Sequence, residues 1–151
     1  MVLINLDENN DDIEIFKKFI TDNDECHDLI ICYFTATWCG PCKQISPYVN
    51  NIAENNDHLK LIKIDVDKCE DIFGFGQIDC MPTFKFYKNN ILEPIHSFSG
   101  ADTEELVNTI KLLLNSDNDE NDNDNDNDNN DDVKYNYNYE TQYAKLNNEI
   151  K

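Results

Sequence analysis

The segment TATWCGPCKQ, residues 35 to 44, lies where one hydrophobic pattern gives way to another. The residues that lead into it, LIICYFTA (29–36), are nearly all apolar and rich in β-branched and aromatic side chains, which predicts a central strand covered on both faces. The segment is therefore predicted to join this strand to a helix, with two cysteines, Cys39 and Cys42, at the junction. The helix is predicted to begin near Cys39, because apolar residues then recur at helical spacing on one face: Ile45, Tyr48, Val49, Ile52 and Ala53.

Strand and helix patterns alternate on either side of this junction. Further strands are predicted at VLINL (2–6), LKLIKIDV (59–66), TFKFYK (83–88) and ILEPIHSFS (91–99). The last two are expected to form a hairpin around Asn89-Asn90, because asparagine tolerates the positive φ of such a turn. Helices are predicted in three further places: after Asp11 or Asp12, over residues 67–75, and after Asp102. This order predicts an α/β fold with a central mixed sheet flanked by helices.

The composition changes abruptly near residue 115. Residues 116–132, SDNDENDNDNDNDNNDD, contain acids, asparagines and one serine but no apolar side chain. Because such a segment cannot bury enough apolar surface to offset the entropy of ordering, we expect a domain at 1–115 and a disordered, Asp/Asn-rich, low-complexity tail at 116–151. A calcium loop of the EF-hand type that begins at Asp122 is excluded, because its sixth and twelfth positions, which require glycine and glutamate, hold Asn127 and Val133.

The net charge of the protein restricts the partners that it can bind. The 151 residues carry 31 acidic side chains against 12 lysines and no arginine, for a net charge of −19. This charge disfavours nucleic acids and anionic membranes as partners.

The first residues, MVLINLDENNDD, show neither the basic start nor the long apolar run of a secretion signal, so a cytoplasmic location is expected. The six cysteines are then expected to be thiols or redox groups rather than a disulfide framework.

Cys39 and Cys42 could hold a metal, staple the fold or exchange electrons. Structural zinc usually needs two close ligand pairs, but the other cysteines and the three histidines are scattered, so no metal is expected. A disulfide that closes so short a loop would constrain the unfolded chain very little. At a helix N-terminus, however, unpaired N–H groups and the helix dipole favour the thiolate, and Pro41 suits the first turn. Cys39 is therefore predicted to be the nucleophile and Cys42 the resolving thiol.

The chain contains ATWCGPCK, then Pro47, then CMPTF (80–84) and FSGA (98–101). In this order the motifs resemble those of the thioredoxin family, most closely of its eukaryotic cytosolic members, over roughly residues 1–114. The resemblance implies the thioredoxin fold and a protein-disulfide reductase active in electron transport and cell redox homeostasis. Such a reductase holds no bound cofactor and receives electrons from NADPH through a thioredoxin reductase. Disulfide-containing proteins would be its substrates, and the protein would be a monomer.

The resemblance also implies roles for residues near the cysteines. Pro82 matches the family's cis-proline, which presents the backbone of Met81 to the substrate, and cis peptide bonds are almost confined to proline. Gly40 and Pro41 match the pair found in reducing members. Trp38 matches the tryptophan that flanks the nucleophile, with simple packing as the alternative.

The remaining cysteines have weaker assignments. Cys80 resembles a non-catalytic cysteine that, in some eukaryotic thioredoxins, lies near the substrate surface and forms dimers or is modified. This would give it a regulatory role, and a spare surface thiol is the alternative. Cys32, in the middle of a predicted strand, is expected to be a small core residue. Cys26 and Cys69 have no predicted role.

One position departs from the family pattern. Family members usually carry a buried aspartate six residues before the first cysteine, which helps to deprotonate the resolving thiol, whereas this chain has Tyr33 there. Lys63 stands where some members carry a lysine that pairs with the aspartate. Because tyrosine is a poor base near neutral pH, slow resolution by Cys42 is expected. Two other functions stay open: a non-enzymatic adaptor with weakened redox activity, and an enzyme that traps substrates as long-lived mixed disulfides.

Overall fold

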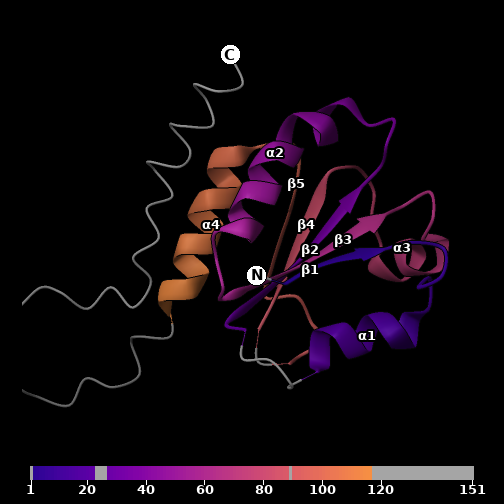
Figure 1. Cartoon of the computed structure of the whole chain (residues 1–151), viewed down its shortest axis with the longest axis horizontal. Helices are drawn as coiled ribbons and strands as arrows, with labels where there is room; N and C mark the ends of the chain where they lie inside the picture. The colour runs from indigo at the N-terminus through magenta and orange to yellow at the C-terminus, as the bar shows by residue number, and fades with distance from the viewer. Residues whose placement is uncertain (1, 23–26, 89, 117–151) are drawn as a thin grey trace, which may run out of the picture. The chain divides into compact units, whose positions relative to one another are not determined.

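The computed structural model describes residues 2–22, 27–88 and 90–116 of the chain. Five strands and four helices follow one another along these residues, and they alternate except where β5 follows β4 (Figure 1). In chain order they are β1 (Val2–Leu6), α1 (Ile13–Thr21), β2 (Leu29–Thr35), α2 (Gly40–Glu54), β3 (Leu59–Asp65), α3 (Glu70–Gly76), β4 (Thr83–Tyr87), β5 (His96–Ser99) and α4 (Thr103–Asn115). The chain divides into two compact units, Met1–Asp102 and Thr103–Lys151, and α4 is the described part of the second.

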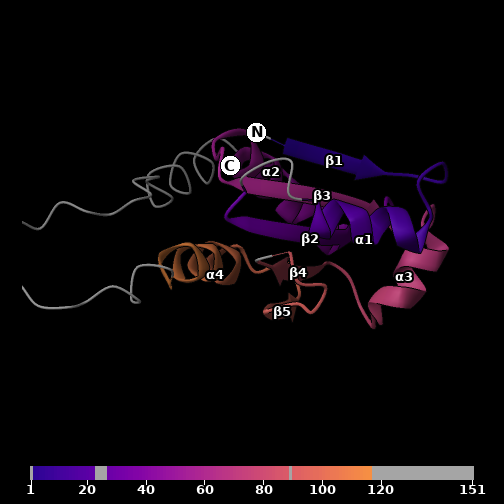
Figure 2. The same ribbon diagram turned by 90° about the horizontal axis from the view of Figure 1, so that it is seen from below.

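The five strands form one mixed sheet in the order β1-β3-β2-β4-β5, which Figure 2 shows from one edge to the other. β1 and β2 both run parallel to β3, whereas β4 runs antiparallel to β2 and to β5. β2 lies at the centre with a partner on each side, and all seven of its residues are buried. The prediction of a buried central strand next to the two cysteines is therefore confirmed.

Helices cover both faces of the sheet within the first unit, as Figure 1 shows for α1 and α2. On one face, Phe16 and Ile20 of α1 and Ile72 of α3 share a hydrophobic cluster with residues of β2 and β3. On the other face lies α2, which contacts β3 and buries Ile45, Val49 and Ile52. A helix-flanked mixed sheet is thus confirmed as the fold class.

Two neighbouring aspartates cap two different helices. Asp12 is the N-cap of α1, and its side chain accepts hydrogen bonds from the backbone N–H groups of Glu14 and Ile15. Asp11 instead accepts from the N–H groups of Asp71 and Ile72, each at 3.1 Å, at the start of α3. Cys69 is the N-cap residue of α3, but its side chain accepts no hydrogen bond from the helix. Asp11, about sixty positions earlier in the sequence, caps α3 instead.

The predicted strand over residues 91–99 is too long, because β5 begins only at His96. Residues 91–95 form an irregular connection instead of a two-residue turn. Pro94 within this segment has no N–H to donate to a ladder, which explains the late start of the strand. The antiparallel pairing of β4 with β5 is confirmed. Asn90 has the positive φ expected of it, and Asn89 lies outside the described residues.

The predicted disordered tail, apart from Ser116, lies outside the residues that the structure describes, and so does Cys26, which has no predicted role. Within the described ranges, no helix has both the length and the apolar character that crossing a bilayer requires. The helix predicted after Asp102 is α4, and its buried residues include Leu106, Ile110 and Leu114 on one face.

Candidate active site

Cys39 and Cys42 form a disulfide at the start of α2, where the sequence placed them. Cys39 is the N-cap residue, and its Sγ accepts a hydrogen bond of 3.2 Å from the backbone N–H of Cys42. Pro41 lies in the first helical turn, where its missing N–H removes no helical hydrogen bond. Both cysteines are buried, but Cys39 is 5 % exposed and Cys42 only 1 %. The pair is therefore reached from outside through Cys39.

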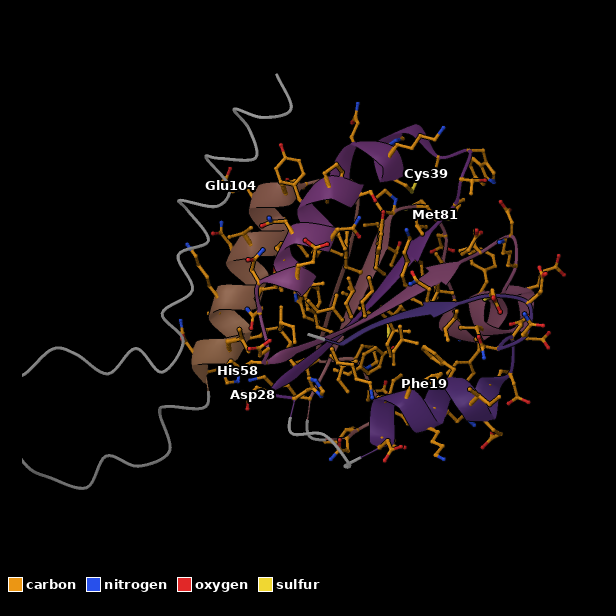
Figure 3. All side chains as sticks on the ribbon, in the orientation of Figure 1. Phe19, Asp28, Cys39, His58, Met81 and Glu104 are labelled. Carbon is orange, nitrogen blue, oxygen red and sulfur yellow. A yellow bond between two sulfur atoms is a disulfide. The ribbon has the colours of Figure 1, made fainter. Side chains whose placement is uncertain are left out.

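Met81 and Pro82 lie directly against this disulfide. The Met81–Pro82 peptide bond is cis, as the resemblance implied. Cys39 Sγ lies 3.8 Å from the carbonyl oxygen of Met81, and Figure 3 labels both residues at the same end of the sheet. The segment is fixed on its other side, because the N–H of Gly100 donates to the Pro82 carbonyl oxygen at 2.8 Å. Two segments far apart in the sequence thus meet at one sulfur atom.

Trp38, the residue before Cys39, lies at the surface of the protein. Its side chain is 65 % exposed, so packing in the core does not explain it. The indole Nε1 donates a hydrogen bond of 2.8 Å to Oδ2 of Asp67, in the loop after β3. Sequence reasoning missed Asp67, and the only available signal was its position in an acidic segment after a predicted strand.

Tyr33 lies beneath the first turn of α2. It is 1 % exposed, and its hydroxyl donates a hydrogen bond of 3.2 Å to the carbonyl oxygen of Cys42. Burial raises the pKa of Tyr33 above its ordinary value, and a hydrogen bond with Thr35 works in the opposite direction. Lys63, half-buried, is its register partner on β3. A neutral hydroxyl therefore occupies the position where the family usually has a carboxylate.

The other described cysteines differ in accessibility. Cys80 is exposed, next to Met81, as expected of a surface thiol. Cys32 is buried in β2, as expected of a core residue, and burial raises its pKa. Cys69 is also buried, and its Sγ donates to the carbonyl oxygen of Asp7 at 3.5 Å. Burial, together with the charges of Asp11, Asp65 and Asp7, raises the pKa of Cys69 to about 11.

Metal chemistry has no candidate site in the part of the chain that the structure describes. Among those residues, no three side chains of histidine, cysteine, aspartate or glutamate are grouped so that they could hold a metal ion. The remaining chemistry of the site is that of sulfur: a disulfide at a helix N-terminus, one of whose sulfur atoms faces a backbone carbonyl group.

This fold and this disulfide together define a thiol–disulfide oxidoreductase. The family model named Thioredoxin matches residues 7–112. The chain therefore belongs to the thioredoxin family. It is a thioredoxin-like protein-disulfide reductase, and the comparisons give no support to the adaptor alternative.

Individual relatives agree with this assignment. The chain is 48 % identical to a thioredoxin of Ophiophagus hannah over 83 residues, which are 55 % of this chain and 77 % of that protein. It is 40 % identical to a human thioredoxin over 86 residues, or 57 % of this chain and 80 % of the relative. Among solved structures, reduced Schistosoma mansoni thioredoxin matches with a TM-score of 0.63 at 32 % identity, over 75 % of this chain and 99 % of that one.

Proposed function

We propose that the protein reduces disulfide bonds of protein substrates in the cytoplasm, with electrons that come from NADPH through a thioredoxin reductase. Thioredoxins in general act on disulfide substrates and are reduced by such an enzyme. The observation that carries the proposal is the closed Cys39–Cys42 disulfide, whose Cys39 sulfur faces the Met81 carbonyl oxygen. NADPH would bind to the reductase, so this chain needs no cofactor of its own.

The two cysteines take different steps in the proposed reaction. In the reduced protein, the Cys39 thiolate attacks one sulfur of the substrate disulfide, forms a mixed disulfide with it and releases the other sulfur as a thiolate. Cys42 then loses its proton to solvent and attacks Cys39 Sγ. The bond between Cys39 and the substrate breaks as the Cys39–Cys42 bond forms. The substrate thus gains two electrons from the pair, and its two released thiolates take up protons from solvent.

The surface around Cys39 is proposed to bind the substrate chain. The Met81 carbonyl oxygen lies next to the attacking sulfur of Cys39. An extended substrate segment that reaches this sulfur can therefore hydrogen-bond to the Met81 backbone. Pro82 holds that carbonyl in place from within the fold, where it is buried. Gly40 and Pro41 are exposed beside the sulfur, so neither obstructs the approach.

Single cysteine variants test the assignment of the two steps. The Cys42→Ser variant should attack a disulfide substrate and stay attached to it, because no second thiol resolves the mixed disulfide. The Cys39→Ser variant should attack almost nothing, and Cys80→Ser, as the matched control, should turn over like the unchanged protein. Non-reducing electrophoresis after incubation with an oxidised protein would show the trapped species. Equal trapping by the two active-site variants would contradict the assignment.

Turnover with thioredoxin reductase and NADPH tests the electron source. The full chain should oxidise NADPH in the presence of a reductase and a disulfide substrate, and Cys39→Ser should not. If the protein is instead reduced only by glutathione, the proposed source of electrons is wrong. The same assay distinguishes a turning-over enzyme from one that holds its substrates as long-lived mixed disulfides.

Residues 1–115 are proposed to contain all of the redox chemistry, with 116–151 as a separate segment that the chemistry does not need. The family match ends at residue 112, in agreement with this boundary. A chain cut after residue 115 should keep the melting temperature and the turnover of the full chain. A second proposal is that the protein is a monomer that forms dimers only through oxidation of the exposed Cys80, which Cys80→Ser would abolish.

A further inference from the structure

Tyr33 makes a contact that differs from anything the family resemblance implied for its position. Its hydroxyl donates to the backbone carbonyl oxygen of Cys42, the resolving residue, rather than standing as a base next to the thiol. The ring is stacked on Phe84 of β4, with centroids 4.9 Å apart and the planes 6° from parallel. Phe84 is stacked in turn on Phe98, at 5.0 Å. The hydroxyl is thus the end of a packed aromatic column.

The strand beneath the hydroxyl is held on both sides. Tyr33 is paired with Lys63 of β3 and with Phe84 of β4 in the sheet register. A side chain that is 1 % exposed on such a strand has little freedom to move. Tyr33 therefore offers a hydrogen-bond donor at a fixed position relative to the sheet.

The beginning of α2 lacks one of the usual hydrogen bonds of a helix. Pro47 inside the helix leaves the carbonyl group of Lys43 without its usual helical partner. The turn is held at its start by Cys39, whose carbonyl oxygen accepts from the N–H of Lys43 at 3.2 Å. The disulfide adds a covalent tie to Cys42, but this tie is absent whenever the pair is reduced or Cys39 is joined to a substrate.

We propose that Tyr33 is a positioning residue for the resolving cysteine: its hydroxyl ties the Cys42 backbone to the sheet and keeps Cys42 Sγ within reach of Cys39 when the disulfide is open. The bond is made to a carbonyl oxygen, so it does not depend on the redox state of either sulfur. The inference rests on the disulfide-exchange function of the pair. It concerns only the step in which Cys42 attacks Cys39 Sγ and the substrate thiolate leaves.

The Tyr33→Phe variant isolates the hydroxyl, because it keeps the ring and its stacking on Phe84. Tyr87→Phe is the matched control, since Tyr87 is a second buried tyrosine. It lies on β4 three positions after Phe84, so its side chain is on the opposite face of the sheet from the Tyr33–Phe84 stack. The substrate is a synthetic peptide dimer joined by one disulfide. Rapid mixing, acid quenching and mass spectrometry then separate the attack by Cys39, which forms the mixed disulfide, from the resolution by Cys42, which releases the second peptide.

In Tyr33→Phe we expect resolution to slow by about two- to tenfold, the range for one neutral hydrogen bond, while the attack rate is unchanged. The equilibrium constant for closing the pair in a glutathione buffer should fall by a similar factor. Tyr87→Phe should change neither. Unchanged resolution and closure in Tyr33→Phe, or an equal fall in attack and resolution with a lower melting temperature, would overturn the proposal. The glutathione equilibrium needs no peptide, so it tests Tyr33 even if the reductase function fails.

Discussion

Trp38 Nε1 donates a hydrogen bond of 2.8 Å to Asp67 Oδ2, so the exposed indole beside Cys39 is tied to the loop that follows β3. An exposed aromatic ring on a flexible loop would lose conformational freedom when a substrate covers it. With the ring already held by Asp67, much of that loss has occurred before the substrate arrives. We therefore expect Asp67 to preorganise the ring for the substrate binding proposed around Cys39.

Replacing Asp67 tests this role of the hydrogen bond. In Asp67→Ala the indole loses its acceptor, so we expect KM for a protein substrate to rise about two- to fivefold, while kcat stays the same. Asp67→Asn is the control, because its amide oxygen can still accept the bond. Trp38 is the single tryptophan of the chain, so its fluorescence anisotropy reports the freed ring directly. Unchanged anisotropy in Asp67→Ala would contradict the prediction.

The remote cap of α3 predicts a loss of stability. Asp11→Ala leaves the N–H groups of Asp71 and Ile72 without their acceptor, and loss of a helix cap usually lowers the free energy of unfolding by about 1 kcal/mol. Chemical denaturation should show this loss, and Asp11→Asn, which keeps an acceptor oxygen, should recover most of it. Asp12→Ala should lower the free energy of unfolding by a similar amount, because Asp12 caps α1 in the same way. The losses of the two single variants should therefore add in the double variant. A double variant that is no less stable than either single one would contradict independent caps.

The Trp38–Asp67 bond and the Asp11 cap also show which parts of the structure the sequence predicts. The strand-to-helix junction, the cap at Asp12 and the cysteine pair all follow from residues within a few positions of one another. The Trp38–Asp67 bond spans 29 positions and the Asp11 cap about sixty, so both depend on how the elements pack. Local pattern contains no such information. In the same way, the sequence identified Tyr33 as unusual but did not predict that its hydroxyl would bind the Cys42 carbonyl group.

Burial of Cys69 predicts a dependence of stability on pH. The folded state raises its pKa from 9.0 to about 11, so the unfolded chain loses this proton first as the pH rises. The free energy that the buried thiol contributes is fully present below about pH 9 and declines between about pH 9 and pH 11. The free energies of unfolding of the unchanged protein and of Cys69→Ala, measured with denaturant, should therefore differ less at pH 10.5 than at pH 8. A constant difference across that range would contradict the raised pKa.

The Tyr33→Asp change tests the missing carboxylate. A buried aspartate could accept the proton of Cys42, so resolution near neutral pH should be faster in Tyr33→Asp than in Tyr33→Asn, which has the same size and no charge. Both variants lose the aromatic ring and leave a cavity, and the buried charge adds to the cost, so we expect Tyr33→Asp to lose roughly 3 kcal/mol or more of stability. Lys63, opposite it on β3, is placed to pair with the new charge.

Stopped-flow kinetics between neutral and alkaline pH would decide this. In the unchanged protein, resolution should accelerate as the pH rises and Cys42 ionises without help. Tyr33→Asp should depend less on pH over the same range. If the aspartate and asparagine variants resolve at the same rate, water already takes the proton and the tyrosine does not slow the reaction.

The strand order of the sheet has a consequence for how the chain is made. β1 precedes β3 by more than fifty positions, yet Val2 is paired with Lys60 of β3, and among the described strands β1 has no other neighbour in the sheet. Until β3 has left the ribosome, the strand VLINL has no partner, and apolar strands in that state are open to pairing with other chains. The β4–β5 pair, in contrast, closes over a short connection and can form as soon as it emerges. We therefore expect β1 to be exposed to pairing with other chains until β3 has been synthesised.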